Sequence, residues 1–364
     1  MKKELQIPST NETILKGFIY EPDTEAKGIV LICHGMAEHI QRYNKFMQFL
    51  CDNNYIVFGY DQRGHGQTAG SVENCGYMDD TDNIQALVYD LHIVIEYIKK
   101  DHENLPIYLF GHSMGSFISQ RFVELYDKEI NGLILSGSTF NEGLFINAGH
   151  ALASIITKFK GRKHISKLIN NLSLGSYNKA FKPNETSVDW LSRDKENNIK
   201  YEQDEYCGMI FSVSYFKDLT KSFKLIANDL ELISNDLPIY IMSGDNDPVG
   251  NFGKGTTKLY NKLKCDIIGH FDLITKYNAD GSLFDAKHPR YIAAWQAAAD
   301  AIIKTPAVVE INTGGIARGH VSEPYPSKEI IEYFKSHGKK MIFSSDCHNK
   351  DYLLCGYDTV KKYL

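Results

Sequence analysis

The segment Gly111-His112-Ser113-Met114-Gly115 has the pattern Gly-x-Ser-x-Gly. It follows the apolar run Ile107–Phe110 and precedes a stretch with helical spacing of apolar residues, Phe117–Tyr126. A strand, a sharp turn and a helix in this order form a nucleophile elbow, which lifts a serine hydroxyl above the edge of a sheet. The pattern predicts Ser113 as an acyl-transfer nucleophile. The alternative is a serine that only caps the helix.

A serine nucleophile also needs backbone N–H donors for the oxyanion that forms on the substrate. Met114 begins the expected helix, so its N–H group is one candidate donor. The second donor should come from the loop after an earlier strand, and His34-Gly35-Met36 follows the apolar run Gly28–Cys33. We therefore predict Met36 as the second donor, the alternative being an ordinary strand-to-helix turn.

The acidic member of a catalytic triad should follow a later strand. The segment SGDNDPVG, residues 243–250, ends the apolar run Pro238–Ser243 and offers Asp245 and Asp247. In a glycine-rich turn one aspartate commonly makes the turn while the other faces the site. Spacing alone leaves both aspartates as candidates.

The elements that would position these residues alternate between short apolar runs and amphipathic stretches. Residues Asp82–Lys99, for example, carry apolar side chains at helical spacing. Strands buried on both faces with helices between them indicate a mainly parallel sheet in an α/β fold. The predicted strands of the first part of the chain are Gly28–Cys33, Tyr55–Tyr60, Ile107–Phe110, Gly132–Ser136 and Pro238–Ser243.

This alternation stops between about residues 139 and 223, where lysine-bearing helical stretches and clustered aromatic residues occur. We predict a helical lid over the carboxyl edge of the sheet, the alternative being a surface excursion without a role. The lysines and aromatic residues of this segment suit transient contact with a membrane surface, although a solvated face also explains the lysines.

Four segments together resemble one enzyme family. From about residue 7 to 264 the chain is similar to the monoacylglycerol lipase/lysophospholipase-like α/β hydrolases of the serine aminopeptidase S33 type. The resemblance implies that Ser113 is the nucleophile, Asp247 the acid, and Met36 and Met114 the oxyanion donors, without a cofactor. Asp245 then keeps the turn role. The matching segments are HGMAEH (34–39), YDQRGHG (60–66), GHSMG (111–115) and SGDNDPVG (243–250).

After Lys264 the family's last strand, its helix and its histidine turn are not recognisable. Three segments instead resemble the C-terminal part of a histidinol-phosphatase of the PHP superfamily, which has a β/α barrel: 265–278, 308–319 and 343–348. That resemblance implies a divalent metal held by His270, Asp346 and His348. It also implies a phosphate site lined by Glu310, Asn312, Arg318 and His320. The barrel half that would carry a His-x-His pair is absent from the sequence.

We therefore expect two parts in the chain. Residues 1–264 are predicted to form an α/β-hydrolase domain that lacks its usual last strand and helix, and residues 265–364 a partial PHP segment. The run Cys265–Gly269 is expected to pair beside the strand that precedes Asp247. In that position it would place His270 as a candidate catalytic base, 23 residues after the acid.

Three functional hypotheses follow. The first is a serine hydrolase acting on a small lipid or ester, a monoacylglycerol or lysophospholipid. The alternatives are a metal-dependent histidinol-phosphate phosphatase and a catalytically impaired fusion product.

Composition also limits the partners and the location of the protein. The 364 residues have a formal net charge of −5 without long charge runs, so nucleic acid is not an expected partner. Seven cysteines without a Cys-x-x-Cys pair, and no signal peptide at the first residues, favour a cytoplasmic protein.

Overall fold

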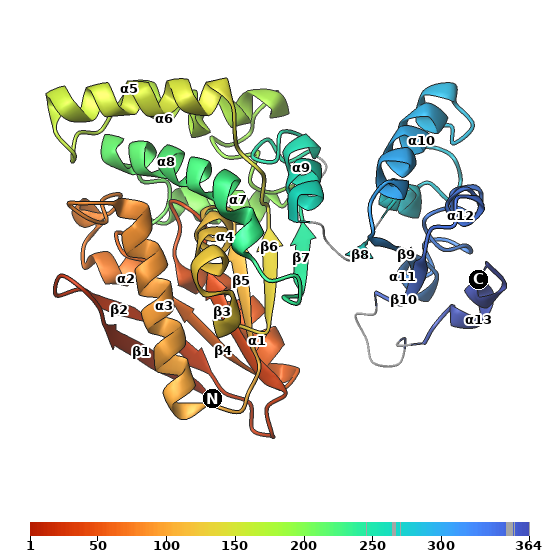
Figure 1. Cartoon of the computed structure of the whole chain (residues 1–364), viewed down its shortest axis with the longest axis horizontal. Coiled ribbons are helices and arrows are strands. Elements are labelled where there is room, and N and C mark those ends of the chain that lie inside the picture. The colour runs from red at the N-terminus through yellow and green to blue at the C-terminus, as the bar shows by residue number, and fades with distance from the viewer. Residues whose placement is uncertain (245, 264–266, 270, 347–351, 353, 364) are drawn as a thin grey trace. The chain divides into compact units, whose positions relative to one another are not determined.

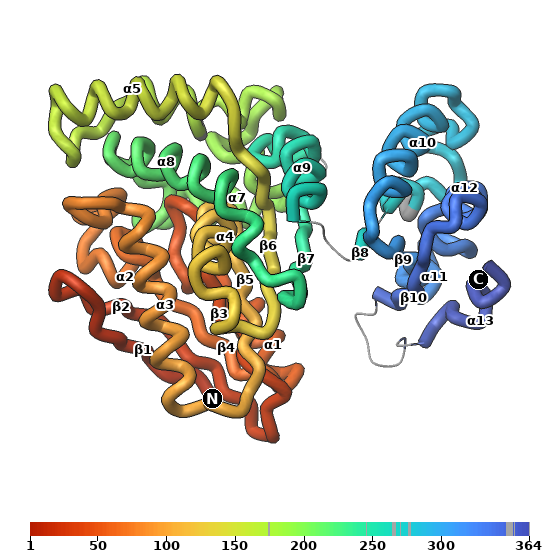
Figure 2. Tube along the Cα trace, in the orientation of Figure 1, coloured from red at the N-terminus to blue at the C-terminus, as the bar shows by residue number. Residues whose placement is uncertain are grey.

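The computed structural model describes residues 1–244, 246–263, 267–269, 271–346, 352 and 354–363. The chain divides into two compact units, Met1–Lys262 and Leu263–Leu364 (Figures 1 and 2). Each unit has its own sheet. The two units are described separately below.

The first unit is built on a seven-stranded sheet with the order β1-β2-β4-β3-β5-β6-β7. The hairpin β1–β2 is antiparallel and β2 pairs antiparallel with β4, whereas the five strands from β4 to β7 run parallel. This sheet confirms the predicted α/β fold with a mainly parallel sheet. Its strands are β1 (Lys2–Pro8), β2 (Ile14–Tyr20), β3 (Gly28–Cys33), β4 (Tyr55–Tyr60), β5 (Ile107–His112), β6 (Gly132–Ser136) and β7 (Ile239–Met242).

Every residue of the central strand β3 is buried, which indicates that both faces of this sheet are covered by helices. The predicted helix over Asp82–Lys99 is α3, whose first turn is capped by the Asp82 carboxylate through the N–H groups of Ile84 and Gln85. Figure 1 shows α3 and α4 along one side of the sheet. The covering helices are α1 (Asn44–Asp52), α2 (Gly66–Ala69), α3 (Asn83–Asp101), α4 (Met114–Tyr126) and α9 (Lys254–Leu263), with the short 3-10 helices η1 (Ile40–Tyr43), η2 (Val72–Asn74) and η3 (Asp127–Glu129).

A helical insertion, defined here as α5 to α8, lies between β6 and β7. Figure 1 shows α5 and α8 stacked at the same end of the sheet. Asp218 of α8 ties the insertion to the first turn of α3, since its carboxylate accepts hydrogen bonds from the N–H and side-chain amide of Asn83, at 3.0 and 2.7 Å. The elements are α5 (Leu144–Lys160), α6 (Lys167–Leu172), η4 (Leu174–Phe181), α7 (Lys195–Gln203) and α8 (Val213–Asp229), followed by η5 (Leu230–Leu232).

No helix in the described part of the chain combines the length and the apolar character needed to span a lipid bilayer.

The second unit contains a three-stranded parallel sheet with the order β10-β9-β8. Its core gathers Trp295, Ala299, Val309, Ile330 and Phe334. The elements are β8 (Ile267–Ile268), η6 (Leu273–Tyr277), α10 (Pro289–Ile303), β9 (Val308–Asn312), α11 (Gly314–Ala317), α12 (Lys328–Ser336), β10 (Met341–Ser344), α13 (Tyr357–Val360) and η8 (Lys361–Tyr363).

The second sheet corrects one prediction. The run Cys265–Gly269 was expected to extend the first sheet beside β7, but Ile267 and Ile268 pair with Val308 and Val309 of β9. The next residue with an apolar side chain, Phe271, packs against the core of the second unit. Pairing with β9 and the packing of Phe271 against the core of the second unit place this strand in the second sheet.

Candidate active site

Ser113 lies at the junction of β5 and α4 in a strained backbone conformation, with φ 49° and ψ −115°. Its N–H group donates to the carbonyl oxygen of Ser136 on β6 at 2.9 Å, and its own carbonyl accepts from the Ser116 hydroxyl at 2.6 Å. The turn can form only because the flanking glycines leave room. A Cβ on Gly111 would come within 2.7 Å of the carbonyl oxygen of Gly115. This conformation is that of a nucleophile elbow.

The loop that carries Met36 is fixed by side chains on both sides of it. The Glu38 carboxylate accepts the N–H of Gly35 at 2.7 Å and the hydroxyl of Tyr43 at 2.7 Å, and it pairs with Arg42 at 3.0 Å. These bonds hold the backbone turn on which the N–H of Met36 depends. Met36 itself is half-buried, in the loop that follows β3.

His34 supports the same loop as a neutral side chain. Its Nε2 accepts the N–H of Gln62 at 3.0 Å, so Nδ1 carries the proton and donates to the Gly35 carbonyl at 2.8 Å. Burial lowers the pKa of His34 to about 3, with the nearby His39 and His112 acting in the same direction. His34 is therefore a structural histidine and not a proton carrier at neutral pH.

A second anchor of this loop comes from the DQRGHG segment. The Asp61 carboxylate is buried and accepts the N–H groups of Ile40 and Gln67, at 2.7 and 2.8 Å. Burial raises the pKa of Asp61, while these two hydrogen bonds act in the opposite direction. Sequence reasoning used this segment only as part of a resemblance. Its physical role is to fix the start of η1 next to the Met36 loop.

Asp247 follows β7 at the same edge of the sheet as the elbow. Its carboxylate accepts the N–H of Val249 at 2.8 Å and the hydroxyl of Ser243 at 3.3 Å. Burial raises the pKa of Tyr177 in the helical insertion, and the charge of Asp247 acts in the same direction. Asp247 therefore lies near the insertion as well as the sheet edge. The other candidate acid, Asp245, lies outside the described residues.

His112, at the end of β5, lies near Asp247 across the end of β6. A Cβ built on Gly137 would lie 3.4 Å from Cε1 of His112 and 3.5 Å from Oδ2 of Asp247. The Nδ1 atom of His112 lies 3.1 Å from the Ser136 hydroxyl. Sequence reasoning gave His112 no role. The predicted base, His270, lies outside the described residues.

A cavity of about 450 Å³ is lined by Ala37 and by residues of the helical insertion between positions 170 and 210. Ala37 lines it from the loop, and Trp190, Tyr201 and Met209 are among the residues that line it from the insertion. A volume of this size is typical of a small-molecule pocket. Ala37 follows one predicted oxyanion donor in the chain, whereas Met36 and Ser113 are not among the residues that line the cavity.

The second unit gathers part of the predicted phosphate site at the ends of β9 and β10. Arg318 pairs with the Asp346 carboxylate at 2.9 Å, and the Tyr325 hydroxyl donates to the same carboxylate at 3.3 Å. Asn312 is buried, and its Nδ2 atom has no hydrogen-bond partner among the described residues. Glu310 lies beside Gly269, and His320 is exposed to solvent.

The predicted metal ligands of the second unit are Asp346, His270 and His348. The two histidines lie outside the described residues. The Asp346 carboxylate accepts a hydrogen bond from the Arg318 guanidinium, whose positive charge opposes a cation at the same oxygen. Two of the three ligands thus lie outside the described residues, and the metal site stays a prediction.

Comparison with known proteins gives a family match over residues 24–271, to the model described as serine aminopeptidase, S33. A monoacylglycerol lipase of Mycolicibacterium smegmatis is 26% identical over 186 residues, which are 51% of this chain and 58% of that protein. A monoglyceride lipase of Rattus norvegicus is 30% identical over 176 residues, which are 48% of this chain and 54% of that protein. The chain thus spans about half the length of the curated relatives it matches.

A solved structure shows the same fold. The carboxyl esterase of Bacillus coagulans superposes with a TM-score of 0.67 and 25% sequence identity. The superposition covers 72% of this chain and 86% of the esterase.

Proposed function

The chain belongs to the serine aminopeptidase S33 family, and we propose that it hydrolyses carboxylic esters through Ser113, with monoacylglycerols or lysophospholipids as substrates. The observation that carries the proposal is the strained backbone of Ser113 between β5 and α4. Such a conformation costs free energy and persists where a side chain must be presented at one point. A nucleophilic serine explains why the fold keeps it.

In the proposed mechanism the Ser113 hydroxyl oxygen attacks the ester carbonyl carbon while a histidine takes its proton. The N–H groups of Met36 and Met114 stabilise the negative charge on the carbonyl oxygen. The C–O bond to the alcohol breaks, the histidine returns the proton to that alcohol, and water then hydrolyses the acyl-enzyme. The reaction uses side chains and backbone groups only and needs no cofactor.

We propose Asp247 as the acid and His270 as one of two candidates for the base. The family match extends to residue 271 and includes His270, whereas the strand before His270 pairs with β9 and not with β7. Asp247 would orient the imidazole and stabilise its protonated form. His112 is the competing candidate because its ring and the Asp247 carboxylate both lie beside Gly137.

A lipid substrate is supported by the helical insertion, which we propose acts as a lid. Large apolar side chains on α5 are exposed, with Leu144 at 85%, Phe145 at 76% and Phe159 at 76%. An exposed apolar surface of this kind suits transient contact with a membrane surface. The names of the two relatives above also favour a glyceride as the substrate.

We further propose a cytoplasmic location. The cysteines that the structure describes, Cys33, Cys51, Cys75, Cys207 and Cys355, are free thiols. Free thiols persist in a reducing compartment.

The experiment that tests the proposal is labelling of the full chain with a fluorophosphonate probe, together with turnover of monooleoylglycerol and lysophosphatidylcholine. We expect labelling of the unaltered chain and none of Ser113→Ala. Absence of labelling in the unaltered chain would rule out an active serine and would favour the impaired fusion product.

The base is tested in the same assay with His270→Ala and His112→Ala. Loss of a triad member leaves only about 10³- to 10⁴-fold acceleration over water, so turnover should collapse in His270→Ala. Turnover that survives in His270→Ala and collapses in His112→Ala would move the base to His112.

A second candidate function concerns the second unit, which we propose binds a phosphomonoester such as histidinol phosphate. The supporting observation is the pair of buried donors, Nδ2 of Asn312 and Nε of Arg318, without partners among the described residues. Phosphate release from histidinol phosphate is measured with and without added Mn²⁺ or Zn²⁺. No release under either condition would eliminate the phosphatase hypothesis.

A further inference from the structure

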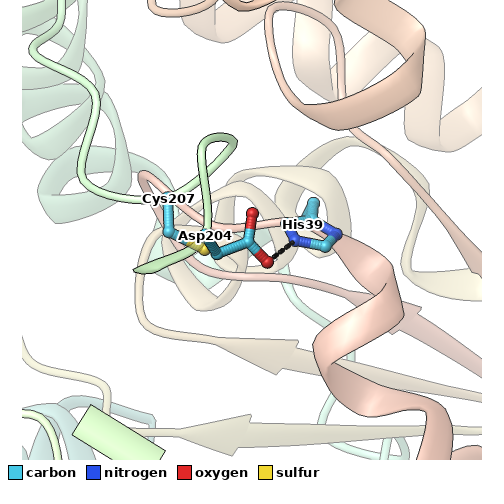
Figure 3. Close-up of side chains that lie close together, drawn as sticks. All are labelled: His39, Asp204 and Cys207. Atoms are coloured by element: carbon cyan, nitrogen blue, oxygen red, sulfur yellow. Dashed lines mark hydrogen bonds and ion pairs between the residues drawn. The ribbon is translucent and has the colours of Figure 1, made fainter. Parts of the chain in front are cut away.

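Three side chains with metal-ligating atoms meet where the helical insertion touches the Met36 loop (Figure 3). They are His39, in the loop between β3 and α1, and Asp204 and Cys207, in the loop between α7 and α8. One nitrogen, one oxygen and one sulfur atom from these residues lie within 4.8 Å of one another. Among the described residues, this is the one group that gathers three such ligand atoms.

The geometry of the cluster is held by bonds on both sides. Nε2 of His39 and Oδ2 of Asp204 are 2.8 Å apart. The other carboxylate oxygen of Asp204 accepts the N–H of Tyr206 at 3.0 Å, which fixes the orientation of the carboxylate. The two loops are themselves joined, because the Ala37 carbonyl accepts the N–H of Gly208 at 2.9 Å. The three ligands are thus presented by a backbone that is already in place.

Binding of a divalent cation at this cluster would have to displace the proton of the Cys207 thiol. Burial raises the pKa of Cys207 to about 12, and the negative charge of Asp204 acts in the same direction. Without a cation the sulfur therefore keeps its proton beside the carboxylate. A divalent ion would stabilise the thiolate and remove its repulsion from Asp204, so the ion would bind as the thiol proton leaves.

One cation lies close to the cluster, the guanidinium of Arg42, which acts against the rise in the Cys207 pKa. Its charge is paired with Glu38 at 3.0 Å, and it also packs over the Tyr201 ring at 4.8 Å. Arg42 also hydrogen-bonds the Cys207 side chain, so zinc binding at the sulfur would require the guanidinium to turn away toward Glu38.

We propose that His39, Asp204 and Cys207 bind one Zn²⁺ ion that clamps the helical insertion to the Met36 loop. A nitrogen, a carboxylate oxygen and a thiolate are ligands that Zn²⁺ takes in proteins, and a tetrahedral site places such atoms about 3.5 Å apart. Small side-chain shifts from the present separations reach that geometry. The Asp204 side chain is 30% exposed, which leaves access for the ion and for water as the fourth ligand.

The proposal goes beyond ester hydrolysis, since the ion would act on the position of the loop and not on the substrate. With zinc bound, the insertion would stay docked on the loop that carries a predicted oxyanion donor. Removal of the ion would free the Asp204–Cys207 loop and lower the stability of the insertion.

Binding is tested on the metal-stripped full chain by titration with Zn²⁺ in competition with a chromophoric chelator. We expect the unaltered chain to bind one equivalent of zinc tightly. The zinc affinity of Cys207→Ser and of His39→Gln should be at least tenfold lower. The matched control is Cys75→Ser, which removes another half-buried thiol and should leave zinc binding unchanged. Zinc should also raise the Tm of the unaltered chain but not that of Cys207→Ser.

The absorption spectrum of the chain with bound Co²⁺ gives a second test, which does not depend on catalysis. Co²⁺ in place of Zn²⁺ should give a thiolate charge-transfer band in the unaltered chain and in Cys75→Ser, but not in Cys207→Ser. If Cys207→Ser fails to fold, Asp204→Asn carries the comparison of zinc affinity in its place. Equal zinc affinity in the unaltered chain, His39→Gln and the Asp204 or Cys207 variant would overturn the proposal and place any bound zinc elsewhere.

Discussion

The carbonyl oxygen of Cys33, the last residue of β3, lies directly against the Cα atom of Gly115 in the first turn of α4. A Cβ at this position would overlap backbone atoms that cannot move away, because every residue of β3 is buried. We expect Gly115→Ala to lower the free energy of unfolding by about 3 kcal/mol or more. Urea unfolding measures this loss.

The matched control for that variant is Gly149→Ala in α5. The nearest atom to a Cβ at Gly149 is a methyl carbon of Thr220 at 3.9 Å, so there is room for the side chain. Alanine is the better helix former, and we expect a gain of about 0.5–1 kcal/mol. Equal effects of the two variants would contradict the close approach of α4 to β3.

Ser113→Gly separates backbone strain from catalysis. The φ of 49° and ψ of −115° are unfavourable for any residue with a Cβ. Relief of the strain should raise the free energy of unfolding by about 1 kcal/mol, whereas Ser113→Ala keeps the Cβ and should change it little. Both variants should lose fluorophosphonate labelling. A fall in the stability of Ser113→Gly would show that the turn is not strained.

Glu38→Gln tests the support of the Met36 loop. The variant removes the charge that pairs with Arg42 and weakens the acceptor of the Gly35 N–H. We expect a loss of stability of about 1–2 kcal/mol and a larger fall in kcat than rise in KM, because the oxyanion donor is displaced. The control is Glu196→Gln, which removes an exposed ion pair with Lys200. Its free energy of unfolding should change by less than about 0.5 kcal/mol.

Two buried histidines should make the stability depend on pH. Burial lowers the pKa of both His34 and His65 to about 3, from 6.5. Between pH 6.5 and 3 the unfolded chain binds protons that the folded chain does not, so stability falls as pH falls in this window. Each histidine should contribute about 1.4 kcal/mol per pH unit, and none of this loss should occur above pH 7.

The pH effect is isolated by comparing urea unfolding at pH 5, 6 and 7 in His65→Leu and the unaltered chain. The slope of stability against pH should be smaller in His65→Leu. His337→Ala, which removes an exposed histidine at the C-terminal end of α12, should leave the slope unchanged. A slope that His65→Leu does not alter would mean that His65 is protonated in the folded state.

Local patterns were enough to predict the parts of the fold that short segments decide. The strand Gly28–Cys33 was predicted with the bounds that the structure has, because a short, wholly apolar run between turns can be buried only as a central strand. The Gly-x-Ser-x-Gly segment likewise predicted the turn at Ser113, since its glycines are needed within five residues of one another.

The sequence by itself thus determined the α/β fold of the first unit, the elbow of Ser113 and the strand ends that carry Met36 and Asp247. Only the tertiary structure decided which sheet β8 joins, which carboxylates hold the Met36 loop, and that His39 meets Asp204 across 165 positions of the chain. The physical reason is that strand pairing and side-chain contacts between distant segments depend on which apolar faces are buried together. The sequence around each residue does not determine that pairing.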